Sequence, residues 1–331
     1  MVKANYGNSK AVGEILKKLK IRDNFLRRRF LKNNFTDEQK LSMLFNAVAI
    51  CHQTRNLYSP GHNLYGWDYI EKAFTSLAEI SSPLLIPDFV VNLKPEELQY
   101  KLLCIFSDTG EAGNSSLDTI EERAELYTSI NKLIISEFQG HFSEMLRSTG
   151  ELLLNNGKGF YEVLSGCEAF SDPQRKKSSF LLKLLIDAGL YSIQDKQNYI
   201  PIVDYHMQRV LLRLGCVEVN DPEYDFKLKN SIPVESDMPV RLACIDSFNT
   251  ISEISGLEVW VMNDIFWPLG RSCCNEITLC TDKKCSKNPC TFDLMIETNH
   301  HNQCIFEKIC QGYLSGMPKE YNEPNVKTHY Y

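Results

Sequence analysis

The sequence predicts an all-α protein with at most one minor, short β element. Apolar residues recur at helical spacing along most of the 331 residues, of which 43% are hydrophobic. Several of these segments also start at a residue that caps helices or stop at a glycine. Strand-like segments are scarce by comparison, and the best of them, LLIPDFVVNL at 84–93, is short. A chain of this length can bury a sizeable core.

The expected helices follow one another from the N-terminus. Thr36 is the expected N-cap of the second, and the seventh is expected to start at Asp204 and end at Gly215. Pro95 falls near the first turn of the fourth, where proline is tolerated. The helices are expected over residues 9–31, 36–54, 66–80, 94–107, 116–138, 172–190, 204–215, 238–256 and 257–270.

Composition divides the chain into three parts. Residues 1–36 form a basic helical segment with ten Lys or Arg and two acidic residues, although the whole chain has a formal net charge of −6. This segment is interpreted either as a phosphate-contacting stripe or as a solvated amphipathic helix. Residues 37–270 are expected to form the main helical domain, and residues 271–331 a cysteine-rich tail. The acidic main part suits a small ligand, or a nucleic acid held at one local patch.

Several function classes find no support in the sequence. No apolar run reaches the length of a membrane span, and the polar start MVKANYGNSK does not resemble a signal peptide. We therefore expect an intracellular protein, cytoplasmic or nuclear, with no membrane association and no implied protein partner. Dinucleotide, P-loop, serine-hydrolase and zinc-protease motifs are all absent from the sequence. Cys51, in CHQT, lies in an apolar helical pattern, which favours packing over a nucleophilic role.

The clustering of cysteines indicates a metal site. Seven of the twelve cysteines fall in the tail, and two of them, Cys304 and Cys310, are separated by five residues. Clustered thiols in an intracellular protein favour metal binding over disulfides. The wide spacing favours an iron–sulfur cluster, with zinc as the alternative and free thiols as a third interpretation. The other tail cysteines are Cys273, Cys274, Cys280, Cys285 and Cys290.

The segment IPIVDYHMQRVLLRLG places a carboxylate where an apolar stretch turns into a helix. Asp204 is either only a helix cap or a functional, partly desolvated acid. The pattern resembles the V-D-x-H-x-x-R segment of the helix–hairpin–helix base-excision DNA glycosylases. The resemblance implies a two-lobed, glycosylase-like helical fold, with Asp204 as the catalytic carboxylate. His206 and Arg209 match the rest of the segment.

The tail carries a second part of this resemblance. WPLGRSCC followed by CIFEKIC is similar to the end of endonuclease III, where Gly-Arg precedes the first ligand of a [4Fe–4S] cluster. This implies Cys274, Cys304 and Cys310 as the first, third and fourth ligands. Cys290 is preferred as the second, with Cys285, Cys280 and Cys273 as further candidates. In SDPQRKKSSF, which is closer to the archaeal oxoguanine glycosylases, Lys176 or Lys177 is either a Schiff-base lysine or a surface charge.

A longer resemblance, over about residues 35 to 265, is to the queuosine salvage proteins, which are N-glycosidases with a glycosylase-like fold. It rests on YGWDYIEKAF, on SLDTIEERAEL and on Val203-Asp204-Tyr205-His206. Trp67 is expected either to stack on a base or to pack in the core, and the pair Glu122 and Arg123 either reaches the ligand or is a surface pair. The remaining substrate-binding candidates that these resemblances imply are Tyr65, Tyr205, His206 and Asn56.

Together these patterns predict an N-glycosidase that hydrolyses the base–sugar bond of a damaged or modified purine, in DNA or as a nucleotide. Asp204 would stabilise an oxocarbenium-like transition state, which develops as the base leaves the sugar. The alternative is a queuosine-type nucleotide salvage hydrolase that releases a 7-deazaguanine base. The second alternative is a non-catalytic iron–sulfur module that binds nucleic acid. The expected partner is thus a nucleic acid or a modified purine nucleotide.

Overall fold

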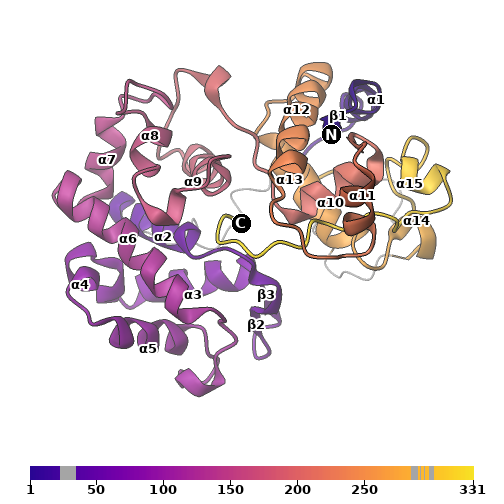
Figure 1. Ribbon diagram of the computed structural model, residues 1–331. Helices are drawn as coiled ribbons and strands as arrows, with labels where there is room; N and C mark the ends of the chain where they lie inside the picture. The colour runs from indigo at the N-terminus through magenta and orange to yellow at the C-terminus, as the bar shows by residue number, and fades with distance from the viewer. Residues whose placement is uncertain (23–34, 285–289, 291, 294, 298–301) are drawn as a thin grey trace. The chain divides into compact units, whose positions relative to one another are not determined.

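The computed structural model describes residues 1–22, 35–284, 290, 292–293, 295–297 and 302–331. The described chain is mostly helical, with two short two-stranded sheets, so the all-α prediction is confirmed (Figure 1). It divides into two compact units. Unit 1 comprises Met1–Asn24 and Ile200–Lys327, and unit 2 comprises Phe25–Tyr199 and Thr328–Tyr331. These units cut across the three segments expected at 1–36, 37–270 and 271–331.

In unit 1, a small sheet joins the N-terminus to the second half of the chain. Strand β1 (Val2–Ala4) pairs antiparallel with β4 (Val217–Val219), and helix α1 (Tyr6–Leu16) packs on α12 (Met238–Ser255). This pairing explains why the N-terminal segment belongs with the second half of the chain. The other helices of the unit are α10 (Tyr205–Leu214), α11 (Pro222–Lys229), α13 (Val261–Pro268), α14 (Leu279–Asp282) and α15 (Gln311–Leu314), and α13 continues into a π-helical turn at Leu269–Cys273.

Unit 2 is organised around the long helix α6 (Ile120–Phe138). This helix packs on α2 (Asp37–Ala49), α4 (Pro87–Val91), α5 (Pro95–Ile105) and α7 (Phe142–Ser148). The other elements are β2 (Tyr58–Ser59), β3 (Leu64–Tyr65), α3 (Trp67–Glu79), α8 (Phe160–Leu164) and α9 (Lys176–Asp187), with short 3₁₀ turns at Thr54–Asn56, Pro83–Leu85, Ala112–Asn114, Glu168–Phe170 and Lys196–Asn198.

Most of the predicted helix ends are confirmed, but the first helix, expected over 9–31, ends at Leu16. Thr36 caps α2 in a capping box with Gln39, and Gly215 ends α10 in the left-handed conformation. The segment 84–93, expected as the best strand, is instead helical. The reason is that Pro83 and Pro87 occupy first-turn positions of two short helices. Proline favours such positions and has no N–H group to donate to a sheet.

Two helices begin later than the sequence predicts. Helix α6 starts at Ile120 rather than Ser116, because the Ser116 hydroxyl bonds the backbone of Tyr58, with Oγ–O at 2.7 Å. Helix α9 starts at Lys176 rather than Asp172. Arg175 before it is left-handed, with φ of 55°, so regular helix cannot extend further back.

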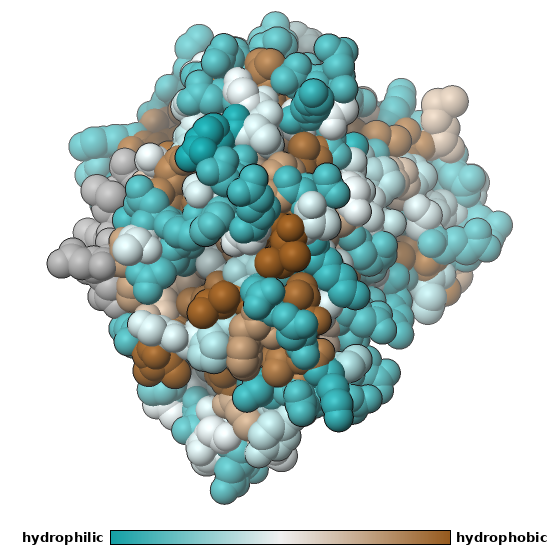
Figure 2. Space-filling view, turned by 90° about the vertical axis from the view of Figure 1, so that its left-hand side faces the viewer, coloured by the Kyte–Doolittle hydropathy of each residue, from teal (hydrophilic) through white to brown (hydrophobic). Residues whose placement is uncertain are grey.

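The face shown in Figure 2 exposes apolar residues in separate groups among hydrophilic ones. Such scattered exposure is ordinary for a folded protein. The large apolar or aromatic side chains that remain exposed include Tyr65, Ile80, Leu154, Phe226 and Leu314. Among the described residues, no helix combines the length and the apolar character needed to cross a bilayer.

Candidate functional site

Asp204 lies at the N-terminus of α10, as the sequence predicts. Its backbone is extended, and its side chain is only 6% exposed. The carboxylate oxygen Oδ1 accepts hydrogen bonds from the backbone N–H groups of His206, at 2.8 Å, and Met207, at 3.2 Å. The apolar residues Ile202 and Val203 before it are buried. The predicted N-cap is confirmed, and it holds a carboxylate at the positive end of a helix.

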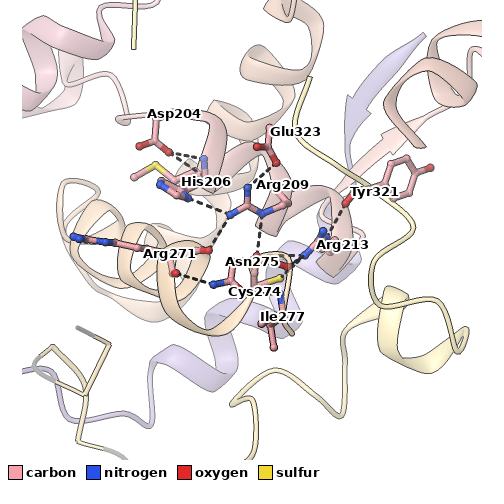
Figure 3. Close-up of polar contacts among 12 residues, drawn as sticks. Asp204, His206, Arg209, Arg213, Arg271, Cys274, Asn275, Ile277, Tyr321 and Glu323 are labelled. Atoms are coloured by element: carbon pink, nitrogen blue, oxygen red, sulfur yellow. Dashed lines mark hydrogen bonds and ion pairs between the residues drawn. The ribbon is translucent and has the colours of Figure 1, made fainter. Parts of the chain in front are cut away.

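Arg209, one turn further along α10, holds the His206 ring (Figure 3). Its Nη2 atom lies 3.1 Å from His206 Nδ1 and also donates to the Gly270 carbonyl at 2.9 Å. A guanidinium group only donates hydrogen bonds, so His206 Nδ1 acts as an acceptor. The neutral ring then carries its proton on Nε2. Arg209 is itself buried, and its Nη1 forms an ion pair with Glu323 at 2.6 Å.

Gly270 allows the π-helical turn Leu269–Cys273 to approach α10 closely. A Cβ atom at Gly270 would lie 2.8 Å from His206 Cβ and 3.0 Å from the His206 carbonyl oxygen. Both distances are shorter than normal contacts, so a larger residue cannot fit without a shift. The Gly-Arg pair singled out in the sequence therefore has a steric role at its glycine.

Half-buried aromatic and cationic groups surround His206. Its ring lies 4.2 Å from that of Tyr205 and meets Trp267 edge-on at 6.2 Å. Arg271 lies over the Trp267 ring at 4.9 Å. Planar rings beside a guanidinium group are a chemistry suited to nucleotides. Trp267 and Arg271 were not among the substrate-binding residues predicted from the sequence, because no local pattern links them to Asp204.

The cysteine segment is tied to α10 through Arg213. The guanidinium Nη1 of Arg213 donates to the Asn275 carbonyl at 2.9 Å and lies 3.7 Å from Cys274 Sγ. Cys310 Sγ donates to the backbone carbonyl of the same arginine at 3.3 Å. Two of the expected ligands, Cys274 and Cys310, are therefore both in contact with one arginine.

Cys280 belongs to the same neighbourhood. Burial, together with the nearby thiols of Cys274 and Cys280, raises the pKa of Cys310 to about 11. Burial and the same two thiols, with Cys310, also raise the pKa of Cys304. We call Cys274, Cys280, Cys304 and Cys310 the cysteine cluster. Within the described part of the chain, however, no group of three or more Cys, His, Asp or Glu side chains is close enough to hold a metal ion.

The remaining predicted ligands are less clearly placed. Cys273 is buried and Cys290 is half-buried, and both make other interactions. Cys285 lies outside the described residues. The resemblance left the second ligand open, with Cys290 preferred, whereas the electrostatic neighbours of Cys304 and Cys310 include Cys280.

In unit 2, Trp67 and Lys176 flank the ring of Phe180. Trp67 is 9% exposed and meets Phe180 edge-on at 4.8 Å, and Lys176 Nζ lies 5.2 Å from the centre of the same ring. No described residue accepts a hydrogen bond from Trp67 Nε1, which is buried. Lys176 is 7% exposed, and its ammonium group likewise contacts no acceptor in the described ranges. The buried donor Trp67 Nε1 thus lacks a protein acceptor among the described residues, which is costly unless a ligand or water supplies one.

Lys177 differs from Lys176. Its side chain is fully buried, and Nζ donates to the Ala49 carbonyl at 2.6 Å. Burial lowers the pKa of Lys177 to about 7. The sequence allowed both lysines to be surface charges in the first turn of α9. Both are buried, because α9 packs on α2.

Glu122 contacts a residue that the sequence reasoning missed. The buried ring of His52 lies with Nε2 3.1 Å from Glu122 Oε2. Burial and the neighbouring cations Lys177 and Arg123 lower the pKa of His52 far below its ordinary value, so the ring is neutral and donates from Nε2. His52 follows Cys51 in an apolar run, and only its long-range contact with Glu122 distinguishes it.

Three other substrate-binding candidates have structural partners. Arg123 is fully buried, donates to Asp118 Oδ1 at 2.8 Å and also bonds the Ile50 carbonyl, which is a structural role rather than a surface pair. Asn56 donates to Asp118 at 3.4 Å. Tyr65 is 47% exposed and stacks on Tyr58 at 4.2 Å.

The predicted residues belong to different units. Asp204, Tyr205, His206 and the cysteines are in unit 1, and Trp67, Tyr65, Asn56, Glu122, Arg123, Lys176 and Lys177 are in unit 2.

Comparison with known proteins gives no assignment. No protein-family model matches this chain, and no curated protein matches it.

The capping role of Asp204 predicts a graded effect of substitution on stability. Asp204→Ala removes the acceptor for two buried N–H groups and should lower the free energy of unfolding by about 1–2 kcal/mol. Asp204→Ser retains an acceptor at the cap and should stay close to the wild type. Urea denaturation followed by circular dichroism measures both. An Asp204→Ala variant as stable as the wild type would contradict the cap.

Lys177 predicts a rise of stability with pH. Its pKa in the folded protein, about 7, lies below that of an unfolded lysine, so the unfolded state binds more protons between these values. The free energy of unfolding should therefore increase from pH 7 toward pH 10 by more in the wild type than in Lys177→Met. Urea titrations at both pH values test this, with exposed Lys158→Met as the control. If the free energy of unfolding changed with pH equally in all three proteins, the lowered pKa of Lys177 would be contradicted.

Proposed function

We propose that the protein is an N-glycosidase that hydrolyses the bond between a modified purine and its sugar, within a glycosylase-like two-lobed helical fold. The observation that carries this proposal is the carboxylate of Asp204, nearly buried and fixed by two backbone N–H groups at the start of α10. The resemblance to the helix–hairpin–helix glycosylases and to the queuosine salvage proteins falls on the same residue.

The chemistry needs a fixed negative charge. As the base leaves, positive charge develops on the sugar ring, and a carboxylate held nearby stabilises it. The same carboxylate orients the attacking water and accepts its proton. The backbone N–H groups of His206 and Met207, in its own helix, donate to Asp204 Oδ1, so the orientation of the carboxylate is set before any substrate binds.

His206 lies two residues from Asp204. Arg209 donates to its Nδ1, so a neutral ring carries its proton on Nε2. Tyr205 and Trp267 add aromatic surface next to it. These contacts support His206 and Tyr205 as substrate-binding residues.

Lys176 and Trp67 support recognition of a base in unit 2. A buried indole N–H without a protein acceptor suits a ligand that carries acceptor atoms, and the half-buried Phe180 ring, which both Trp67 and the Lys176 ammonium group contact, suits a planar one. Lys177 already donates to a carbonyl and is fully buried. Lys176 is therefore the better candidate for contact with the substrate, including the Schiff-base role considered for a lyase.

The cysteine cluster is proposed to hold a [4Fe–4S] cluster, with zinc as the alternative. The support is chemical: the four thiols lie on separate segments of the tail, those of Cys274 and Cys280 influence the pKa of Cys304 and Cys310, and thiolates are the usual ligands of both groups. We propose Cys274, Cys280, Cys304 and Cys310 as the ligands. A bound metal would cross-link these segments and lower the cost of burying their sulfur atoms.

Two alternative functions remain to be compared with this proposal. A queuosine-type salvage hydrolase would release a 7-deazaguanine base from a nucleotide rather than from a polymer. A non-catalytic module would bind nucleic acid through the basic segment 1–36, of which residues 23–34 lie outside the described part. Base release, and the substrate from which it occurs, separates the three.

The decisive test is release of a free base. The full chain is incubated with oligonucleotides that contain modified purines and with the corresponding nucleotides, and the released base is quantified by chromatography. Asp204→Asn keeps an acceptor at the helix cap but removes the charge, and it should slow release by roughly 10²–10⁴-fold. The matched control is Asp221→Asn, which alters the equivalent cap of α11 in the same unit.

The outcomes of this test differ for each function. Release from oligonucleotides supports a DNA glycosylase, and release from nucleotides alone supports the salvage alternative. Wild-type protein that binds an oligonucleotide but releases no base from any substrate supports the non-catalytic module. Release at the same rate by Asp204→Asn would contradict the role of Asp204.

The metal proposal predicts which cysteine substitutions matter. Cys280→Ser should lose the bound metal as completely as Cys274→Ser, whereas Cys290→Ser should retain it. Elemental analysis and the visible absorption spectrum measure metal content, and iron with a broad visible band distinguishes the iron–sulfur cluster from colourless zinc. Retention by Cys280→Ser together with loss by Cys290→Ser would restore Cys290 as the second ligand.

A further inference from the structure

In unit 2, Trp67 and Lys176 contact the same half-buried ring, that of Phe180. The indole meets it edge-on at 4.8 Å between ring centres, and Lys176 Nζ lies 5.2 Å from its centre. Trp67 is nine-tenths buried, and within the described ranges its Nε1 atom has no hydrogen-bond acceptor. We call Trp67, Lys176 and Phe180 the ring site. A buried N–H group without an acceptor points to a ligand or a water that supplies one.

The carboxylates around the start of α9 are engaged with other groups. Asp172 accepts hydrogen bonds from the backbone N–H groups of Gln174, at 3.0 Å, and Lys176, at 2.8 Å. Glu122 accepts from the buried ring of His52, whose electrostatic neighbours include Lys176. In the part of the chain that the structure describes, neither carboxylate forms an ion pair with the Lys176 ammonium group. The charge of this nearly buried lysine is therefore not balanced by an ion pair there.

Lys177 adds a second buried ammonium group. Its Nζ donates to the Ala49 carbonyl at 2.6 Å, and it forms no ion pair with a described residue. Burial, to which the charges of Lys176 and Arg123 add, lowers the pKa of Lys177 to about 7. Arg123, by contrast, has the Asp118 carboxylate as its partner. Two lysines on consecutive residues thus share a poorly solvated place without a counter-ion, and a bound anion would lower the cost of their burial.

We propose that the ring site binds an aromatic phosphate ester. Its phosphate would neutralise Lys176 and Lys177 and accept a hydrogen bond from Trp67 Nε1, and its ring would pack on Phe180. A phosphate monoester carries nearly two negative charges at neutral pH and offers three acceptor oxygens. It therefore matches two ammonium groups in charge, whereas a carboxylate matches one.

The inference rests on the proposed function only for the identity of the natural ligand, since a nucleotide is one such ester. Binding of a simple ester does not depend on base release. Binding without base release would support the ring site and contradict the glycosidase. Base release by a protein that binds no phosphate ester at the ring site would do the reverse.

The test is calorimetric titration of the full chain with benzyl phosphate, inorganic phosphate and benzyl alcohol. Benzyl phosphate should bind most tightly, inorganic phosphate more weakly and benzyl alcohol not measurably. Lys176→Met should raise the Kd of benzyl phosphate by about ten-fold, and Trp67→Phe, which keeps an aromatic ring but removes the N–H group, by about five-fold. The matched control is Lys158→Met, an exposed lysine of the same unit, which should bind like the wild type.

Proton uptake gives a second readout, which a purely structural lysine would not change. A bound anion favours the charged form of Lys177, so the complex should take up protons near pH 8, and the affinity should fall from pH 7 to pH 9. Titration in two buffers of different ionisation enthalpy measures this uptake, which should be absent in Lys177→Met. The titratable or charged groups around Lys177 are Cys51, His52, Arg123, Cys167 and Lys176.

Three results would overturn the proposal. The first is wild-type protein that binds benzyl alcohol as tightly as benzyl phosphate, or binds neither. The second is a Kd for benzyl phosphate that is the same in Lys176→Met and Trp67→Phe as in the wild type. The third is equal proton uptake by the wild type and Lys177→Met. Inorganic phosphate that binds as tightly as benzyl phosphate would contradict the contact with Phe180.

Discussion

The burial of two guanidinium groups on α10 organises unit 1. Arg209 and Arg213 are each less than a tenth exposed, and burying a charge is costly unless its donors are satisfied. Within the described part of the chain, Glu323 is the one carboxylate that forms an ion pair with either of them. Further acceptors are the His206 ring and the backbone carbonyls of Gly270, Cys274, Asn275 and Tyr321. Because these carbonyls can only be reached if their segments fold onto α10, the two arginines fix the course of the chain after α13.

This constraint connects the proposed catalytic turn with the cysteine segment. Arg209 bonds the Cys274 carbonyl through Nε and the His206 ring through Nη2. The planar fork of a guanidinium makes both contacts at fixed angles, which a flexible ammonium does not reproduce. A displacement of Cys274 would therefore also shift the His206 ring. Gly270 packs so closely against His206 that little local rearrangement is possible. The proposed metal ligands and the proposed acid lie at two ends of one hydrogen-bonded assembly.

Local patterns were predictable from the sequence, and long-range partners were not. The caps at Thr36, Asp204 and Gly215 follow from side-chain chemistry within a few residues, and they are confirmed. Ser116 has the same capping chemistry, but it bonds Tyr58, 58 residues away, and no local pattern contains that information. Lys177 and Arg123 look like surface charges for the same reason. Their burial depends on carbonyls at the end of α2, which the spacing of charges along the chain does not show.

The two interpretations of Asp204, cap and acid, are compatible on physical grounds. An ionised carboxylate only accepts hydrogen bonds, and the N–H groups at a helix start only donate them. The arrangement that caps α10 therefore also keeps a negative charge fixed in a nearly buried position. Stabilising a sugar cation requires the same fixed charge, held without reorganisation during the reaction. A serine would cap the helix through the same kind of hydrogen bond. The helix dipole also favours a carboxylate at this position, and the proposed reaction would use the same charge.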